Sequence, residues 1–440
     1  MTKKPYRTNT HQPSIHIFSR THALGFALLL LTPLVTGCAS RETQPPEEKV
    51  ADFQTTPLAA PVIDVAPVND FATCVQGLQR RAIESGVSEH TSNTVLANVQ
   101  YVMKVIELDH KQPEYTETFG NYLNAHVTAD RIKQGRKMLE QNETLFQSLE
   151  DEYGLPAQYL VAFWGLETNY GSYQGKMPVL NSLATLACSD RRADFFAGEL
   201  FEALKLVDAE IVEPDQLVGS WAGAVGNMQF MPSTYRRFAI DADGNGKADL
   251  WHSVPDAMTS AANYLHKSGW HRGEKWGEEV ELPADFDYSQ TGLQQRKSLE
   301  RWRSLQVTYA DGRPLPENDK QAAILLPSGH SGPAFLVYPN FDVIMKWNRS
   351  EFYAISVGYL GDRINGEATL LHTPPPLPRL EIAKVKALQN ALTAAGFDAG
   401  NADGVLGSGT RAAIRGFQKA QGMIADGYPS PEVFTALGIR

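Results

Sequence analysis

A proline-rich run, "HTPPPLPRL" at 372–380, divides this 440-residue chain into two regions that we expect to fold separately. Proline fixes its own φ and has no backbone N–H, so neither a helix nor a sheet continues through such a run. We therefore predict a semi-rigid linker at 372–379 between a large region, 69–371, and a small region, 380–440. The chain is longer than one ordinary domain, which agrees with this division.

The patterns in both regions are mostly helical. Apolar residues recur every three or four positions in stretches such as "ADRIKQGRKMLEQNETLFQSLEDEYG", where Gly154 suits the end of a single helix. The small region contains three such stretches, "LEIAKVKALQNALTAAGF", "SGTRAAIRGFQKAQG" and "SPEVFTALG". The sequence predicts a mainly α (α+β) fold for the large domain and a small three-helix C-terminal domain.

The N-terminal end has the composition of a secretion signal. Residues 1–22 carry four lysines and arginines and no acidic residue, and the apolar stretch at 23–35 is too short to span a bilayer. The "VTGC" that ends at Cys38 resembles the lipobox of bacterial lipoproteins, in which the cysteine is lipidated. No aspartate follows Cys38, so this resemblance implies anchoring at the periplasmic face of the outer membrane of a Gram-negative bacterium. The alternative is an ordinary signal peptide with a chance cysteine.

These features predict a lipoprotein signal peptide at 1–37 and a flexible tether at 38–68, which is rich in Pro, Glu, Thr and Ala. The formal net charge is −10, and removing the basic signal makes the chain more acidic, which argues against a nucleic-acid partner. Cys74 and Cys188 are then the remaining cysteines. In an oxidising compartment a disulfide between them is the simplest interpretation, and two buried free cysteines are the alternative.

One acidic residue, Glu167, stands at the end of the apolar and aromatic stretch "VAFWGLETNYGSYQG" at 161–175. Helical spacing places it on the same stripe as Phe163 and Trp164. A carboxyl among aromatic side chains at the end of a helix should have a raised pKa, which suits a general acid that protonates a leaving oxygen. The alternative is a last-turn glutamate that points into solvent.

A second motif, "SWAGAVGNMQFMPSTY" at 220–235, combines small residues with the polar Gln229. Small residues allow a backbone to approach a ligand closely, and an amide can bind sugar hydroxyl or acetamido groups. Together, "GLETNYG" and "GAVGNMQFMPSTY" resemble the lytic murein transglycosylase family, specifically its membrane-bound B type with a goose-lysozyme-like catalytic domain. The resemblance extends from residues 71–88 through 348–364.

By this resemblance Glu167 is the single catalytic acid, and Ser220 and Gln229 line the cleft and position the muramic acid. The other polar cleft residues that it implies are Tyr264, Asn348 and Tyr353. For the two tyrosines, an aromatic core contact with a satisfied hydroxyl is an equal alternative.

The resemblance also implies the reaction. Glu167 would protonate the oxygen between N-acetylmuramic acid and N-acetylglucosamine and then deprotonate the C6 hydroxyl, which closes a 1,6-anhydro ring without water. No cofactor is expected for catalysis. Two alternatives stay open: a hydrolytic muramidase, which a second carboxylate in the cleft would favour, and an inactive wall-binding lipoprotein scaffold.

The stretch "DADGNGKADLWHSVPDA" at 241–257 has oxygen side chains at the spacing of an EF-hand calcium loop, although His252 stands where a bidentate glutamate belongs. Membrane-bound B-type relatives are similar in closing this loop with a later aspartate. The candidate ligands for a structural Ca²⁺ are Asp241, Asp243, Asn245, the Lys247 carbonyl, Asp249 and Asp256. The alternative is a glycine-rich turn without an ion.

The three helices of the small region, with their "DGVLG" and "ADG" turns, resemble the type 1 peptidoglycan-binding domain. This resemblance implies peptidoglycan glycan strands as the partner and a domain that holds the enzyme on the wall. A helical cap on the large domain is the alternative.

Overall fold

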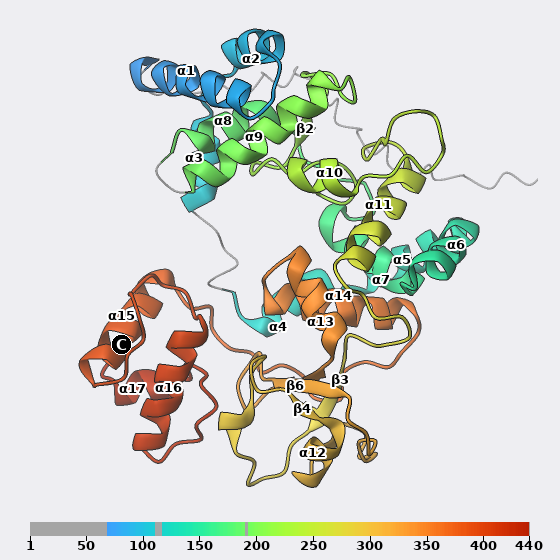
Figure 1. The fold of residues 1–440 in the computed structure, drawn as a ribbon. Coiled ribbons are helices and arrows are strands. Elements are labelled where there is room, and N and C mark those ends of the chain that lie inside the picture. The colour runs from blue at the N-terminus through green and yellow to red at the C-terminus, as the bar shows by residue number, and fades with distance from the viewer. Residues whose placement is uncertain (1–67, 111–116, 190–191, 440) are drawn as a thin grey trace, which may run out of the picture. The chain divides into compact units, whose positions relative to one another are not determined.

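The structure of the protein is a computed structural model that describes residues 68–110, 117–189 and 192–439 (Figure 1). The predicted signal peptide at 1–37, the predicted lipidation site Cys38 and nearly all of the predicted tether at 38–68 lie outside these residues. Among the described residues, none of the helices has both the length and the apolar character needed to cross a membrane.

Helices dominate the large region, as the sequence predicts. The helices before the first strand are α1 (Val68–Glu84), α2 (Glu89–Val95), the short 3₁₀ helix η1 (Leu96–Asn98), α3 (Met103–His110), α4 (Phe119–His126), α5 (Ala129–Gln141), α6 (Glu143–Tyr153) and α7 (Ala157–Thr168). The later ones are α8 (Val179–Ala187), α9 (Ala193–Asp208), α10 (Pro232–Phe238), α11 (Val254–Lys267), the 3₁₀ helix η3 (Tyr288–Gln290), α12 (Leu299–Ser304), α13 (Pro339–Trp347) and α14 (Glu351–Ile364).

The single helix predicted up to Gly154 is two helices, α5 and α6. They meet at Asn142, whose φ of −122° and ψ of 27° lie outside the helical region. The Met138 carbonyl of α5 accepts hydrogen bonds from both the Asn142 backbone N–H (3.2 Å) and the Asn142 side chain (2.9 Å). Gly154 ends α6 in the left-handed conformation (φ 71°), as predicted.

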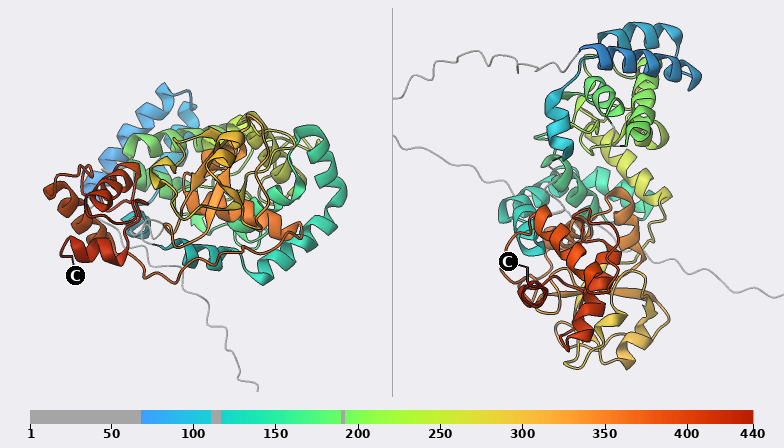
Figure 2. Two further views of the ribbon diagram at one scale, coloured as in Figure 1. Left: turned by 90° about the horizontal axis from the view of Figure 1, so that it is seen from below. Right: turned by 90° about the vertical axis from the view of Figure 1, so that its left-hand side faces the viewer.

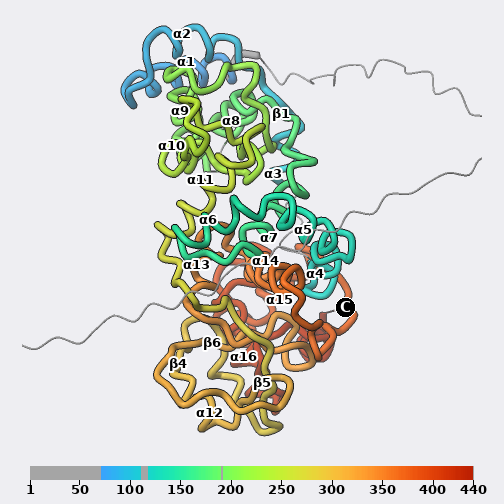
Figure 3. The backbone as a smooth tube through the Cα atoms, turned by 90° about the vertical axis from the view of Figure 1, so that its right-hand side faces the viewer, coloured from blue at the N-terminus to red at the C-terminus, as the bar shows by residue number. Residues whose placement is uncertain are grey.

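Helix α7 is the central helix of the large region, and it contacts α5, α6, α11 and α14. Its residues from Tyr159 to Gly165 are all buried. The predicted apolar stripe with Phe163 and Trp164 is therefore buried, and so are the residues between its members, because neighbours cover this part of the helix. Figures 1 and 3 show α7 and α14 running side by side.

Two antiparallel sheets interrupt the helices. β1 (Met177–Pro178) pairs with β2 (Val218–Gly219) close to the two sequence motifs. The larger sheet has the order β4-β6-β7-β3-β5. Its strands are β3 (Gly277–Glu281), β4 (Lys297–Ser298), β5 (Thr308–Tyr309), β6 (Gln321–Leu325) and β7 (Ala334–Val337). Alternate residues of this sheet pack with Trp302 and Tyr338 in a separate hydrophobic cluster, while Phe335 and Val337 of β7 belong to the core around α7.

A disulfide joins Cys74 of α1 to Cys188 at the end of α8, with Cα atoms 5.9 Å apart and 114 positions between them in sequence. It links the first helix of the described chain to the core helices.

The small region contains α15 (Ile382–Ala394), α16 (Ser408–Ala420) and α17 (Pro431–Ala436), the three helices that the sequence predicts. These helices, red in Figures 1 and 2, have a hydrophobic cluster of their own, which includes Leu388, Ile414, Phe417 and Val433. The residues at 372–379 form neither helix nor strand.

Candidate active site

Glu167 lies in the last turn of α7, partly buried. Directly after the helix, Asn169, Tyr170 and Gly171 all have positive φ (49°, 60° and 79°), so the chain turns sharply away from the acid. Two side chains donate hydrogen bonds to Glu167 Oε1: the Trp347 indole Nε1 (2.9 Å) and the Tyr353 hydroxyl. The carboxyl is thus held by two neighbouring helices and does not simply extend into solvent.

Aromatic rings surround this carboxyl. Trp347, at the end of α13, lies with its ring centroid 4.6 Å from that of Phe163, 5.1 Å from that of Tyr264 and 5.3 Å from that of Phe230. This apolar wall is the environment that the sequence predicts for the acid, and the raised pKa of Glu167 stays a prediction. Sequence reasoning missed Trp347, although it directly precedes the predicted cleft residue Asn348.

A buried asparagine, Asn227, locks the two sequence motifs together. Its side-chain oxygen accepts a hydrogen bond from Trp164 Nε1 (3.0 Å), and its backbone carbonyl accepts one from the Thr168 hydroxyl (2.8 Å). Its side-chain Nδ2 donates to the carbonyls of Leu250 (3.1 Å) and Trp251 (2.9 Å). Asn227 therefore fixes the end of α7 against the second motif. The signal that could have found it is a polar residue among the small residues of that motif.

Gln229 and Ser220 lie in the turns of the second motif. Gln229 adopts a left-handed backbone conformation (φ 47°), and its Nε2 donates to the carbonyls of Gln174 and Gly226 (3.1 Å each). Both N–H groups of this amide are therefore used by backbone carbonyls. The Ser220 hydroxyl accepts a hydrogen bond from the Ala224 N–H (3.0 Å) and so stabilises the turn that carries it.

The structure divides the remaining predicted cleft residues. Tyr353, in the first turn of α14, contacts the acid directly. The Tyr264 hydroxyl donates to the Lys346 carbonyl (3.0 Å), and burial raises the pKa of this tyrosine. Asn348 follows α13, and its side-chain oxygen accepts a hydrogen bond from the Ser350 N–H (3.0 Å). In the structure Tyr264 and Asn348 therefore support the helices that carry Trp347 and Tyr353.

The predicted calcium loop brings three carboxylates together: one oxygen each of Asp241, Asp243 and Asp256 lie within 4.8 Å of one another. Asp256 is fully buried and accepts hydrogen bonds from the N–H groups of Ala242 (2.9 Å) and Asp249 (2.8 Å). Converging carboxylate oxygens are the ligand type that calcium prefers, so the residues present fit this ion.

Two further predicted ligands of the loop lie around these carboxylates. The side-chain oxygen of Asn245 accepts a hydrogen bond from the Lys247 N–H (3.0 Å). Asp249 is not among the three: its carboxylate accepts hydrogen bonds from the N–H groups of Trp251 and His252 (2.9 Å each). The Asp249 carboxylate therefore stabilises the local turn through these hydrogen bonds.

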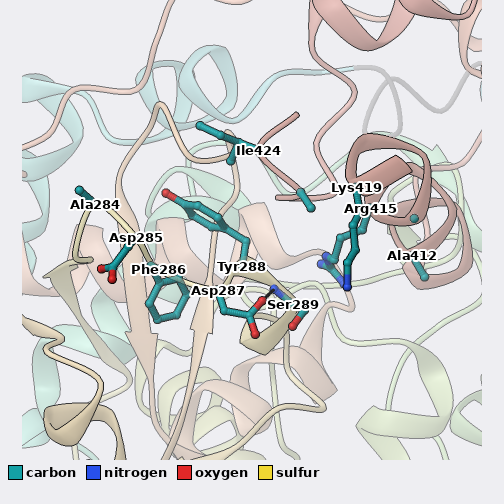
Figure 4. A pocket seen from close by; sticks show the side chains of 12 residues that line it. Ala284, Asp285, Phe286, Asp287, Tyr288, Ser289, Ala412, Arg415, Lys419 and Ile424 are labelled. Carbon is teal, nitrogen blue, oxygen red and sulfur yellow. Dashed lines mark hydrogen bonds between the residues drawn. The ribbon is translucent and has the colours of Figure 1, made fainter. Parts of the chain in front are cut away.

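A separate pocket of about 570 Å³ is lined by residues 284–289 and by residues of the small region (Figure 4). Arg415 and Lys419 lie on one side of it, and Asp285 and Asp287 lie on the other. None of the predicted catalytic or cleft residues lines this pocket.

Both regions of the chain match known protein families. Residues 70–362 match the family model of the transglycosylase SLT domain. The chain belongs to this family. Residues 382–437 of this transglycosylase match the family of peptidoglycan binding domains. The family resemblance drawn from the two motifs and from the small region is thereby confirmed.

Individual relatives agree with this family. The transglycosylase is 32% identical to membrane-bound lytic murein transglycosylase B of Escherichia coli (strain K12) over 249 residues, which are 55% of this chain and 66% of that protein. It is 41% identical to SltB3 from Pseudomonas aeruginosa, solved in complex with NAG-anhNAM-pentapeptide, with a TM-score of 0.80 over 84% of this chain and 99% of that one. It is 29% identical to the lytic transglycosylase Slt35 of Escherichia coli, solved with calcium, with a TM-score of 0.59 over 66% of this chain and 92% of that one.

Proposed function

We propose that this transglycosylase cleaves the β-1,4 bond between N-acetylmuramic acid and N-acetylglucosamine in peptidoglycan without water and leaves 1,6-anhydromuramic acid ends. One observation carries the proposal: Glu167 sits among aromatic rings, and both Trp347 and Tyr353 donate hydrogen bonds to one oxygen of its carboxyl. Neither sequence motif contains a second acid that would activate a water molecule.

The hydrogen bonds suggest how one carboxyl serves both steps. The Trp347 indole and the Tyr353 hydroxyl donate to Oε1 of Glu167 and hold the carboxyl in one orientation. The protonated carboxyl donates to the glycosidic oxygen as the bond to C1 breaks. The resulting carboxylate then takes the proton of the C6 hydroxyl, whose oxygen closes on C1 to form the anhydro ring. The substrate supplies its own nucleophile, so the atoms balance without water.

Ser220 and Gln229 are our candidates for positioning the muramic acid. They lie on turns that Asn227 and Gln174 tie to the end of α7. The closeness of these turns depends on glycine: a Cβ added at Gly175 would lie 2.1 Å from the Gly219 carbonyl oxygen. The ligand named for SltB3, NAG-anhNAM-pentapeptide, contains the anhydromuramic group expected of the product.

We further propose a lipid anchor at Cys38 on the periplasmic face of the outer membrane, with the small region holding the enzyme on peptidoglycan. The lipobox-like "VTGC" and the name of the membrane-bound Escherichia coli relative support the anchor. The peptidoglycan-binding family of residues 382–437 supports the wall attachment. Cell wall turnover and remodelling would be the corresponding role.

We also propose that the loop at 241–256 binds a structural Ca²⁺ through Asp241, Asp243 and Asp256, together with Asn245 and the carbonyl of Lys247. The convergence of three carboxylates and the calcium complex of Slt35 support this ion. Asp249 would contribute through water, as the ninth position of such loops often does. Added Ca²⁺ should raise the melting temperature of the wild-type protein, and Asp256→Asn should abolish the increase.

The test of the reaction is mass analysis of fragments released from purified peptidoglycan by a soluble form that begins at Ala39, beside the same form with Glu167→Gln. Fragments with anhydromuramic ends, one water lighter than hydrolysis products and lost in the variant, are the expected result. Reducing ends would instead identify a muramidase. Wall binding without any release would favour the scaffold alternative.

A further inference from the structure

A buried aspartate outside the active site, Asp362, joins the two helices that form the site. Glu167 near the end of α7 accepts the Tyr353 hydroxyl from the start of α14. At the opposite end of the same pair, Asp362 near the end of α14 accepts the Tyr159 hydroxyl from the start of α7 (3.0 Å). The helices are therefore antiparallel, with one tyrosine-to-carboxyl hydrogen bond at each end.

The two bonds are spaced alike along both helices. Tyr159 precedes Glu167 by about 12 Å of helix, and Tyr353 precedes Asp362 by about 13 Å, at 1.5 Å per residue. A helix slides as a unit, so axial displacement of α7 against α14 would stretch both bonds together.

Close packing fixes the position of the Asp362 carboxyl, and with it the alignment of α14 along α7. Its second oxygen accepts a hydrogen bond from Trp276 Nε1 (2.8 Å). Two glycines of α14 make room for the donor rings: a Cβ at Gly361 would lie 2.5 Å from Tyr159, and one at Gly358 would lie 2.2 Å from Trp276. Real Cβ atoms do not approach so closely, so the absence of side chains at these positions is what lets the rings reach the carboxyl.

The chemistry of this group is unusual for a residue with only a packing role. Burial, reinforced by the charge of Glu367, raises the pKa of Asp362 to about 7, while the hydrogen bonds from Trp276 and Tyr159 and the charge of Lys275 oppose this rise. Burial also raises the pKa of Tyr159 far above its ordinary value, so its hydroxyl stays a donor. A buried carboxyl of this kind costs stability, which makes a functional reason for it worth testing.

We propose that Asp362 is a positioning residue for the catalytic acid: through Tyr159 it holds α14 in register with α7 and so keeps the Tyr353 hydroxyl on Glu167. The inference rests on the proposed role of Glu167, and it adds residues at the opposite end of the α7–α14 pair.

The first experiment compares Tyr159→Phe with a matched control. Tyr338 is also buried and donates its hydroxyl to a carboxylate, Glu278 (2.8 Å), but it belongs to the hydrophobic cluster of the large sheet and to neither helix. Tyr159→Phe should lower kcat for anhydro-product release roughly tenfold with KM changed less than about twofold, because the acid is misplaced but the sugar contacts remain. Tyr338→Phe should leave both constants unchanged.

A double-mutant cycle tests the route. If Asp362 acts through the hydrogen bond from Tyr353 to Glu167, then Tyr159→Phe should have little further effect on kcat once Tyr353→Phe has removed that bond. If the loss of kcat in the double variant equalled the product of the two single losses, the proposed route would be overturned, because the two residues would then act independently.

An NMR signal tests the positioning role independently of the proposed reaction. The Trp347 indole N–H donates to Glu167, and its NMR cross-peak, identified by its loss in Trp347→Phe, reports on the position of the acid. Tyr159→Phe should shift this peak and Tyr338→Phe should not. An unmoved peak, or equal losses of kcat in both variants, would overturn the positioning role. Should the wild-type enzyme release no anhydro products, the proposed function fails while the peak still decides the register.

Discussion

Asp362→Asn tests how much stability the buried carboxyl costs. The asparagine has nearly the same shape but does not titrate. The side chain of Asp362 is buried, and its pKa is raised to about 7 from an ordinary 3.8. A group whose pKa is raised by folding stabilises the folded state below its unfolded pKa, and this contribution is lost as the pH rises through the folded pKa. The shift of about three pH units corresponds to roughly 4 kcal/mol.

The measurement is the free energy of unfolding in urea for both proteins at a series of pH values. Between about pH 4 and pH 7 the wild type should lose up to about 4 kcal/mol relative to Asp362→Asn, and above pH 7 the difference should level off. Effects of other titrating groups cancel in the difference, provided that Glu367, Lys275 and Tyr159, which surround the carboxyl, are unchanged. A difference that stays constant with pH, or one that grows in favour of the wild type, would refute the reasoning.

Three further changes test other parts of the structure. Trp347→Phe removes a hydrogen bond to the Glu167 carboxyl, the proposed catalytic acid, and should lower kcat at saturating substrate roughly tenfold; an unchanged kcat would show that the indole only packs. Replacing Cys74 and Cys188 together by serine removes the disulfide and should lower the free energy of unfolding in urea by about 3 kcal/mol, whereas an unaltered urea midpoint would contradict a stabilising role. Gly358→Ala should cost about 2 kcal/mol or more by overpacking, while Gly198→Ala, in an exposed helical position with open space, should be neutral or slightly stabilising in the same assay.

The aromatic surroundings of Glu167, the proposed catalytic acid, could be predicted from sequence because their signal is local. A single carboxyl follows an aromatic run within one helix, and the second motif lies only some 50 positions later. Trp347 could not be found in this way, since it reaches Glu167 from a helix 180 positions away and a tryptophan in an apolar stretch usually indicates core. Asp362 could not be predicted either, because Tyr159 and Trp276, which donate hydrogen bonds to it, lie 203 and 86 positions away in the sequence.

Some features of the fold could likewise not be predicted from the sequence. The apolar spacing continues across Asn142, so the pattern predicts one helix where the structure has two. The mainly α class and the three C-terminal helices follow from periodicity within each helix, whereas the order of the five-stranded sheet depends on pairings such as that of β3 with β7, which no single stretch of sequence encodes. The burial of α7 on all sides is likewise a property of its neighbours.

The paired tyrosine-to-carboxyl bonds between α7 and α14 have a consequence for how such enzymes diverge. A one-residue insertion between Tyr159 and Glu167, or between Tyr353 and Asp362, would rotate one of these residues by about 100° relative to the other, so the two bonds could no longer form together. The lengths of these helices should therefore be inherited unchanged, while loops elsewhere drift. Homologues that have lost the acid at position 362 should also have lost the hydroxyl at position 159, because a mutation of either partner alone would leave the other buried without its match.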